Sequence, residues 1–227
     1  MSHASARCLA LMLALASLLA ACRAEQKAEP TAPSPPTIDA PATHDATPAD
    51  DAATAHTPSA DVPVWVAAAR QQVGVTIHYD PAYVVLGYPG GDVPAERGVC
   101  TDVVIRALRH DGLDLQQRLH EDMRGNFARY PRNWGLARPD RNIDHRRVPN
   151  LEVWFTRQGW QLPAASDYRP GDLVTWRLPG GAPHIGIVSD RRAADGTRLI
   201  LHNINRGTRE ENVLHSWPIN GHFRPAL

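Results

Sequence analysis

Hydrophobic positions recur at helical spacing in the first half of the region that follows residue 61. Apolar residues three or four positions apart fall on one face of a helix, so this spacing predicts helices. Four are predicted: from Asp61 to Gly74, over 101–110, after Asp114, and from Pro149 to Gly159. Residues 75–99 and 131–149 lack the period, and we expect extended segments, turns and loops there.

After residue 171 the hydrophobic period changes to two. Alternation of apolar and polar residues predicts half-buried strands, here over 172–178, 184–189 and 198–204. Asp195-Gly196 forms a tight turn between the last two, so these strands are antiparallel neighbours. A chain that places its helices first and a strand meander afterwards is typical of the α+β class.

The first 22 residues follow a different pattern. Arg7 precedes an apolar run over 9–19, which has the length of a signal peptide and is too short to span a bilayer. The run ends Leu-Ala-Ala-Cys22, which resembles the lipobox of bacterial lipoproteins. The resemblance implies a lipid anchor on Cys22, with Arg23 favouring the periplasmic face of the outer membrane; the alternative is an ordinary secretory peptide cut after Ala21.

Composition divides the rest of the chain in two. Residues 23–61 are dominated by Ala, Pro, Thr and Asp and carry no recurrent large apolar residue, which predicts a disordered tether. Residues 62–227 form one domain with 21 arginines against 17 acidic residues. This mild excess of positive charge is not concentrated in a stripe, so we expect no nucleic-acid partner.

The cysteine count isolates one thiol. Cys8 leaves with the signal peptide and Cys22 is lipidated, so Cys100 has no partner for an internal disulfide. A lone thiol of this kind is either buried and inert or retained for its chemistry. Cys100 directly precedes a predicted helix, where the free amides and the helix dipole favour a thiolate with a pKa of roughly 3.5 to 7.5. The same amides can bind the oxyanion of an acyl intermediate.

A thiol nucleophile needs a base and a group that orients the base. His184 begins one predicted strand, and His202 and Asn203 lie on the next. Adjacent residues of a strand point to opposite faces, so at most one of His202 and Asn203 can reach His184. His202 is the first candidate and Asn203 the second.

Several motifs resemble papain-like cell-wall cysteine peptidases of the NlpC type. The stretch RPGDLV over 169–174 is similar to a strand start of those enzymes, and HIGIV over 184–188 to the strand that carries their catalytic histidine. Together with GVCTDVVIRAL, NIDHRRVPNL and HNI, these stretches also resemble the bacterial family called domain of unknown function 1287, a relative of the peptidases. The resemblance implies a papain-like fold with Cys100 as nucleophile, His184 as base and His202 orienting it.

The residues around the nucleophile depart from the usual Asp-Cys-Ser of the NlpC type. Val99 and Thr101 flank the cysteine, which puts the usual stem-peptide specificity in doubt, although Asp102 can partly replace the missing acid. Tyr83 and Tyr88 lie upstream, where those enzymes have a tyrosine near the oxyanion; simple packing is the alternative for both.

A charged stretch over 140–147 completes the set of substrate-binding candidates. It contains Asp144, Arg146 and Arg147, and an arginine can hold a carboxylate of the peptidoglycan stem through two hydrogen bonds. The alternative is a solvated loop with internal ion pairs.

The expected function is thiol-dependent hydrolysis of an amide in peptidoglycan stem peptides or cross-links, because the anchor and tether hold the domain near the wall. Two alternatives stay open: an acyltransferase with the same Cys-His site, and a non-catalytic wall-binding module. The sequence carries neither HExxH nor CxxC, so no metal or other cofactor is expected.

Overall fold

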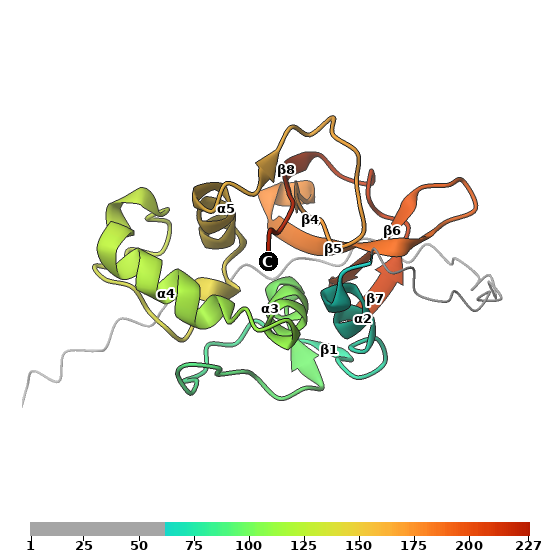
Figure 1. Ribbon diagram of the computed structural model, residues 1–227. Coiled ribbons are helices and arrows are strands. Elements are labelled where there is room, and N and C mark those ends of the chain that lie inside the picture. Colours follow the sequence, from blue (N-terminus) through green and yellow to red (C-terminus); the bar gives the residue numbers. More distant parts are fainter. Residues whose placement is uncertain (1–61) are drawn as a thin grey trace, which may run out of the picture. The chain divides into compact units, whose positions relative to one another are not determined.

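The computed structural model describes residues 62–227 (Figure 1). The expected signal peptide, Cys22, the tether over 23–61 and the predicted cap Asp61 lie outside the described residues. Within 62–227 the fold combines four α-helices with a six-stranded antiparallel sheet. No helix in this part of the chain is long and apolar enough to cross a membrane.

All four predicted helices are present. They are α2 (Val64–Arg70), α3 (Cys100–His110), α4 (Leu115–Asn126) and α5 (Val148–Arg157). The side chain of Asp114 caps α4 by accepting the amide hydrogen of Gln116 at 3.0 Å. Pro149 lies in the first turn of α5, where its missing N–H costs nothing. In the described part of the chain three 3₁₀ turns supplement the helices: Phe127–Arg129, Asp144–Arg146 and Pro179–Gly181.

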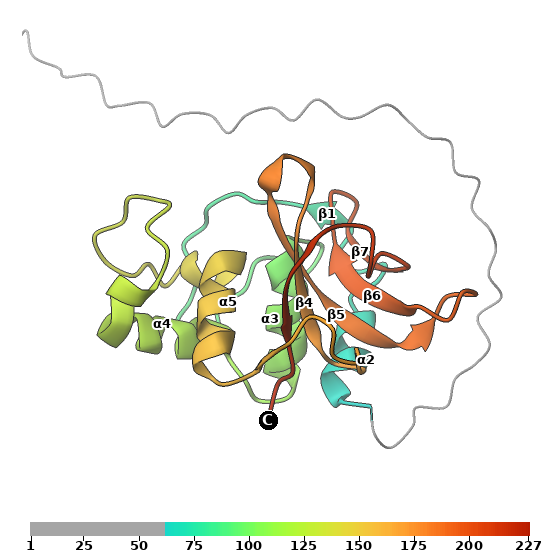
Figure 2. The ribbon, with the colours of Figure 1, turned by 90° about the horizontal axis from the view of Figure 1, so that it is seen from above.

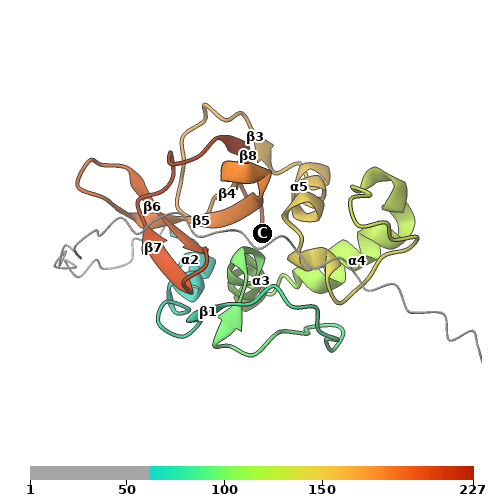
Figure 3. The same ribbon diagram turned by 180° about the vertical axis from the view of Figure 1, so that it is seen from behind.

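The main sheet has the order β3-β8-β4-β5-β6-β7, with every neighbouring pair antiparallel. Its strands are β3 (Gln161–Leu162), β4 (Leu173–Arg177), β5 (Pro183–Arg192), β6 (Arg198–Asn203), β7 (Thr208–Glu211) and β8 (Ile219–Phe223). The predicted strands correspond to β4, β5 and β6, whereas β3, β7 and β8 were not predicted. The last strand, β8, lies between β3 and β4 rather than at an edge (Figure 3), and β4, β5 and β6 lie side by side in Figure 2.

A second, minimal sheet lies next to the start of α3. It consists of β1 (His78–Tyr79) and β2 (Arg97–Gly98), which run parallel and place Tyr79 beside Gly98. Since Gly98 lies two residues before Cys100, this pairing holds the polypeptide that leads into α3.

The two faces of the main sheet pack against different neighbours. The helix-facing side joins residues such as Ile185, Ile187 and Phe223 to α3 and α5, and Cys100 belongs to this core cluster. In Figures 1 and 3, α3 lies against β5 on that side. The opposite side carries a smaller cluster that includes Trp176 and Ile200. His184 and His202 lie on this second side. His184 is paired with Trp176, and His202 follows Ile200 by two residues, so each shares a face with a member of the smaller cluster.

Candidate functional site

Cys100 is the first residue of α3, and its thiol is almost completely enclosed. The residue is 4% exposed. The amide groups of Ile185 on β5 and of Thr101 on α3 point at the sulfur. The carboxylate of Asp102 accepts the amide hydrogen of Val99 at 2.6 Å and so closes the first turn of the helix. The nucleophile candidate therefore lies where the helix start meets the strand that carries His184.

Burial dominates the acid–base chemistry of this thiol. It raises the pKa of Cys100 to about 12, and the charge of Asp102 acts in the same direction. The amides of Ile185 and Thr101 lower the pKa but do not offset the loss of solvent. The sequence led us to expect a lowered thiol pKa at a helix start; that expectation was wrong for this enclosed state, because the helix is covered by the sheet.

A chain of three side chains runs across strands β5, β6 and β7. His184 Nε2 lies 2.9 Å from His202 Nδ1, and His202 Nε2 lies 3.1 Å from a carboxylate oxygen of Glu211. A carboxylate accepts, so His202 Nε2 carries the hydrogen and its Nδ1 is left as an acceptor. His184 Nε2 must then donate to that Nδ1. This assignment leaves His184 Nδ1 unprotonated, which is the form that a general base requires.

The close approach of the two histidines depends on Gly186. A Cβ at this position would lie 2.5 Å from Cγ2 of Ile200 and 3.1 Å from Cβ of His202. Only a residue without a side chain lets β6 approach β5 closely enough here. The glycine of the His-x-Gly pattern is therefore a requirement of packing beside the histidine pair.

Asn203, the second candidate for the orienting residue, has a different contact. Its side-chain amide donates to the carbonyl oxygen of Gly98 at 3.0 Å. It thus ties β6 to the segment that leads into Cys100, on the face opposite to His202. The expectation that only one of the two residues reaches His184 agrees with this arrangement.

The base candidate is buried and neutral. Burial lowers the pKa of His184 to about 3, with a further contribution from His202. The rings of Trp176 and Trp217 lie 5.7 and 5.9 Å from the His184 ring, centroid to centroid. Within residues 62–227 no hydrogen bond joins Cys100 to His184. The thiol belongs to the core on the helix-facing side of the sheet, whereas the His184 ring lies with Trp176 on the other side. Both groups are neutral in this state.

Comparison with known proteins places the chain in a family. A family model described as "Domain of unknown function (DUF1287)" matches residues 66–225. The chain belongs to this family. A relative in Escherichia coli (strain K12), "Uncharacterized protein YijF", is 62% identical over 159 residues, which cover 69% of this chain and 78% of the relative. The matched region of the DUF1287 domain contains the thiol and the whole His184–His202–Glu211 chain.

Three of the expected substrate-binding residues form a buried structural cluster in the DUF1287 domain. Arg146 donates to both carboxylate oxygens of Asp102, at 3.0 and 2.9 Å, and the side chains are only 2% and 4% exposed. Arg146 also donates to the carbonyl oxygens of Asp80 and Ala82. The hydroxyl of Thr101 donates to the carbonyl oxygen of Arg146 at 3.1 Å. Arg146 has no free N–H fork for a substrate carboxylate, contrary to our expectation, because Asp102 already occupies it.

The two tyrosines proposed for the oxyanion region have other partners. The hydroxyl of Tyr83 donates to Asp140 at 3.0 Å, and its ring is exposed. Tyr88 packs edge-on against His120, 5.4 Å away between ring centroids. Neither has a hydrogen bond to Cys100 or His184 in the described part of the chain. Tyr83 therefore contacts the 140–147 stretch, and Tyr88 contacts α4.

Asp144 and Arg147 also pair with each other. Their ion pair measures 3.0 Å, and the Arg147 guanidinium lies 4.0 Å from the ring centroid of Trp134. Burial raises the pKa of Asp144 and lowers the pKa of Arg147. The Asp144–Arg147 pair agrees with the alternative of a solvated loop with internal ion pairs, but the burial of Asp144 and Arg146 does not, and Arg146 pairs outside the stretch.

Two residues near the site, Glu211 and Tyr79, were not predicted from the sequence. Glu211 lies on β7, whose polar residues Thr-Arg-Glu-Glu show no apolar alternation. Tyr79, not Tyr83 or Tyr88, is the tyrosine close to the nucleophile candidate: burial raises its pKa, and electrostatic interaction with Cys100 and Asp102 adds to the shift. Its register opposite Gly98 was visible only once β1 and β2 were paired.

Residues 62–227 contain no group of three or more His, Cys, Asp or Glu side chains arranged to hold a metal ion.

Proposed function

We propose that the DUF1287 domain is a papain-like, thiol-dependent amide hydrolase that acts on peptidoglycan stem peptides or cross-links. Cys100 is the nucleophile, His184 the general base and His202 the residue that orients it. The observation that carries the proposal is the hydrogen-bonded chain from His184 through His202 to Glu211, together with a thiol at a helix start that receives the backbone amide of Ile185, the neighbour of His184 on β5. Three ordered groups of this kind are what nucleophilic catalysis needs.

The proposed reaction uses these groups in order. His184 Nδ1 takes the thiol proton as the sulfur attacks the amide carbonyl, and the resulting imidazolium is stabilised through His202 by Glu211. The amides at the start of α3 bind the oxyanion. His184 then gives the proton to the leaving amine, which departs and leaves a thioester. Water, deprotonated by His184, attacks the thioester and releases a carboxylic acid and the free thiol.

The enclosed thiol represents the resting form of this mechanism. Both reactive groups are neutral and desolvated, so proton transfer from sulfur to nitrogen waits for a substrate. Substrate binding must open a path to Cys100, since the residue is 4% exposed. A neutral pair also protects an unpaired thiol from oxidation, because the thiolate is the reactive form.

The wall is proposed as the substrate on grounds of location. The sequence predicts a signal peptide, lipidation at Cys22 and a tether, which together hold the domain at the periplasmic face of the outer membrane. Peptidoglycan is the polymer within reach of a domain tethered there, and its stem peptides offer amide bonds to a thiol nucleophile.

The test is mass spectrometry of peptidoglycan fragments after incubation with the full-length chain. Wild type is compared with Cys100→Ala and His184→Ala, and with His145→Ala as a matched control, because His145 is another buried histidine whose pKa burial lowers. New fragments from wild type and His145→Ala alone support the hydrolase and identify the bond.

Other outcomes distinguish the alternatives. Products that retain the acyl group on a second amine or lipid indicate an acyltransferase. Peptidoglycan that is retained intact by wild type and Cys100→Ala alike indicates a non-catalytic wall-binding module. In that case Cys100 is a core residue, and its thiol should resist alkylation at every pH at which the protein stays folded.

A further inference from the structure

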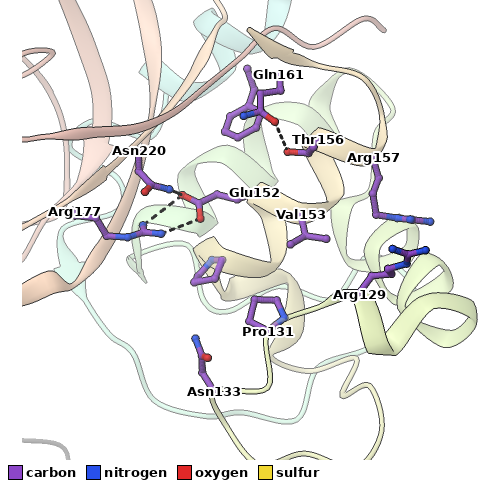
Figure 4. Close-up of a pocket in the computed structure, with 12 residues that line it drawn as sticks. Arg129, Pro131, Asn133, Glu152, Val153, Thr156, Arg157, Gln161, Arg177 and Asn220 are labelled. Carbon is purple, nitrogen blue, oxygen red and sulfur yellow. Dashed lines mark hydrogen bonds and ion pairs between the residues drawn. The ribbon is translucent and has the colours of Figure 1, made fainter. Parts of the chain in front are cut away.

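A groove lies between α5, the segment 129–133 and strands β3, β4 and β8 (Figure 4). Its cavity of about 570 Å³ falls within the range of ligand sites, roughly 300–1,000 Å³. Pro131, Val153 and Phe223 contribute apolar surface, while polar side chains lie at the two ends. A groove of this size and composition fits a short peptide.

One end of the groove is a closed polar network. Glu152 on α5 accepts hydrogen bonds from Arg177 at 3.1 Å and from Asn220 at 2.8 Å. These three side chains come from α5, β4 and β8 and point toward one another in Figure 4. Their charges are balanced, so this end offers polar atoms without a net charge.

The other end of the groove holds an unpaired cation. Arg129 and Arg157 lie there (Figure 4). Arg157 is neutralised by Asp122, to which it donates two hydrogen bonds of 2.8 Å. Arg129 is exposed, and among residues 62–227 its guanidinium has no hydrogen bond or ion pair. This end is therefore suited to a carboxylate, which a guanidinium binds through two parallel hydrogen bonds.

Strand β4 links the Arg177 end of the groove to the strand that contacts the thiol. Thr175 is paired with Ile185, whose amide points at the Cys100 sulfur, and Arg177 follows two residues later. Residues two apart on a strand share a face, so Arg177 and Ile185 lie on the same side of the sheet. The offset is about 7 Å along the strand and about 4.8 Å across to β5. An extended peptide covers that distance with two or three residues.

We infer that this groove is the substrate-binding groove of the proposed hydrolase and takes a short acidic peptide whose free carboxylate binds Arg129. The inference rests on the proposed function for the identity of the peptide. The apolar wall then contacts a side chain of the peptide, and the end near Arg177 leads the scissile amide toward Cys100.

The experiment measures binding without cleavage. The full-length Cys100→Ala protein is titrated calorimetrically with a synthetic stem tetrapeptide that has a free C-terminal carboxylate, and with the same peptide amidated at that end. Arg129→Gln is introduced in the same background. Arg124→Gln on α4 is the matched control, because Arg124 is also exposed and does not line the groove.

We expect Arg129→Gln to weaken binding of the free acid about tenfold, as for loss of one charged hydrogen-bonding group. Arg124→Gln should leave the Kd of the free acid unchanged. Amidation of the peptide should weaken its binding to the Cys100→Ala protein by the same factor as Arg129→Gln weakens binding of the free acid. A diazirine-bearing tetrapeptide should label residues 148–157 or 219–223 on photolysis. Equal affinities for acid and amide, an unchanged Kd in Arg129→Gln, or no binding at all would each overturn the inference.

The two proposals fail separately. If peptidoglycan stays intact in the cleavage assay but the acid binds with the stated dependence on Arg129, the hydrolase is wrong and the groove stands. If fragments appear and Arg129→Gln binds and cleaves as wild type does, the hydrolase stands and the groove is wrong.

Discussion

Glu211 is a single residue that sets the protonation pattern of the whole site. Its carboxylate fixes the hydrogen of His202 on Nε2, which in turn leaves His184 Nδ1 free to act as a base. The hydrogen bond from His202 also lowers the pKa of Glu211, so the carboxylate stays ionised at neutral pH. The carboxylate thus acts on His184 from a strand that does not touch the thiol.

Removing this carboxylate should slow the reaction without unfolding the domain. We expect Glu211→Ala to lower kcat on peptidoglycan about 10- to 100-fold, since the neutral His202 can then take either tautomer. Arg206→Gln is the control. Arg206 donates a hydrogen bond of 3.3 Å to the Glu211 oxygen that does not contact His202, and its side chain is 63% exposed. Steady-state kinetics would contradict the argument if both variants behaved alike.

The pH dependence of cleavage is a second property of individual residues. With the pKa of His184 lowered to about 3 and that of Cys100 raised to about 12, both groups stay neutral between these values. We therefore expect kcat/KM to be nearly constant from about pH 5 to 9. An acid limb centred near the ordinary histidine pKa of about 6.5 would show that His184 is solvated during the proposed reaction.

At the scale of secondary-structure elements, the spacing of β5 and β6 depends on a missing side chain. Gly186→Ala places a methyl group 2.5 Å from Ile200 Cγ2, so the two strands must move apart. We expect a loss of about 1–3 kcal/mol in the free energy of unfolding, together with loss of activity.

A second glycine provides the matched control for that substitution. Gly125 lies in α4, where an added Cβ meets nothing within 4 Å. Gly125→Ala should therefore raise the free energy of unfolding by about 0.5–1 kcal/mol, because alanine favours helix. Urea unfolding of the two variants should show opposite signs; equal signs would refute the packing argument.

The elements differ in how far the sequence predicts them. The helices and the strands β4, β5 and β6 were predicted because their hydrophobic periods are visible in the sequence. By contrast, β3 has two residues and β7 is entirely polar, so their pairing comes from tertiary contacts.

The residues of the candidate site likewise differ in how far the sequence predicts them. Cys100, His184 and His202 were named because their positions on elements follow from local pattern, and the structure joins the two histidines. The partner of Arg146 was not predicted, because Asp102 lies 44 residues away and burial of an ion pair leaves no local trace. An arginine must be exposed to bind a substrate carboxylate, but Arg146 is buried together with Asp102.

At the scale of the whole molecule, buried histidines couple stability to pH. Burial lowers the pKa values of both His145 and His184 to about 3, so the folded state takes up fewer protons than the unfolded chain below about pH 6.5. Their contribution to stability is complete above about pH 6.5 and is lost as the pH falls toward 3.

The free energy of unfolding should therefore decrease on acidification, by up to about 1.4 kcal/mol per pH unit for each histidine. Urea titrations at pH 7, 5 and 4 measure this slope. His145→Phe should reduce the slope, whatever its effect on stability at pH 7. A slope identical to that of wild type would mean that His145 is not the neutral, buried group described above.

The position of β8 also determines how far the sheet can be completed during synthesis. β8 follows the other five strands of the main sheet in the chain, yet it supplies the partner of both β3 and β4 in the middle of the sheet. Until β8 has been synthesised, β4 lacks a neighbour on one side and the core around Phe223 stays open. The sheet therefore cannot be completed strand by strand as the chain emerges.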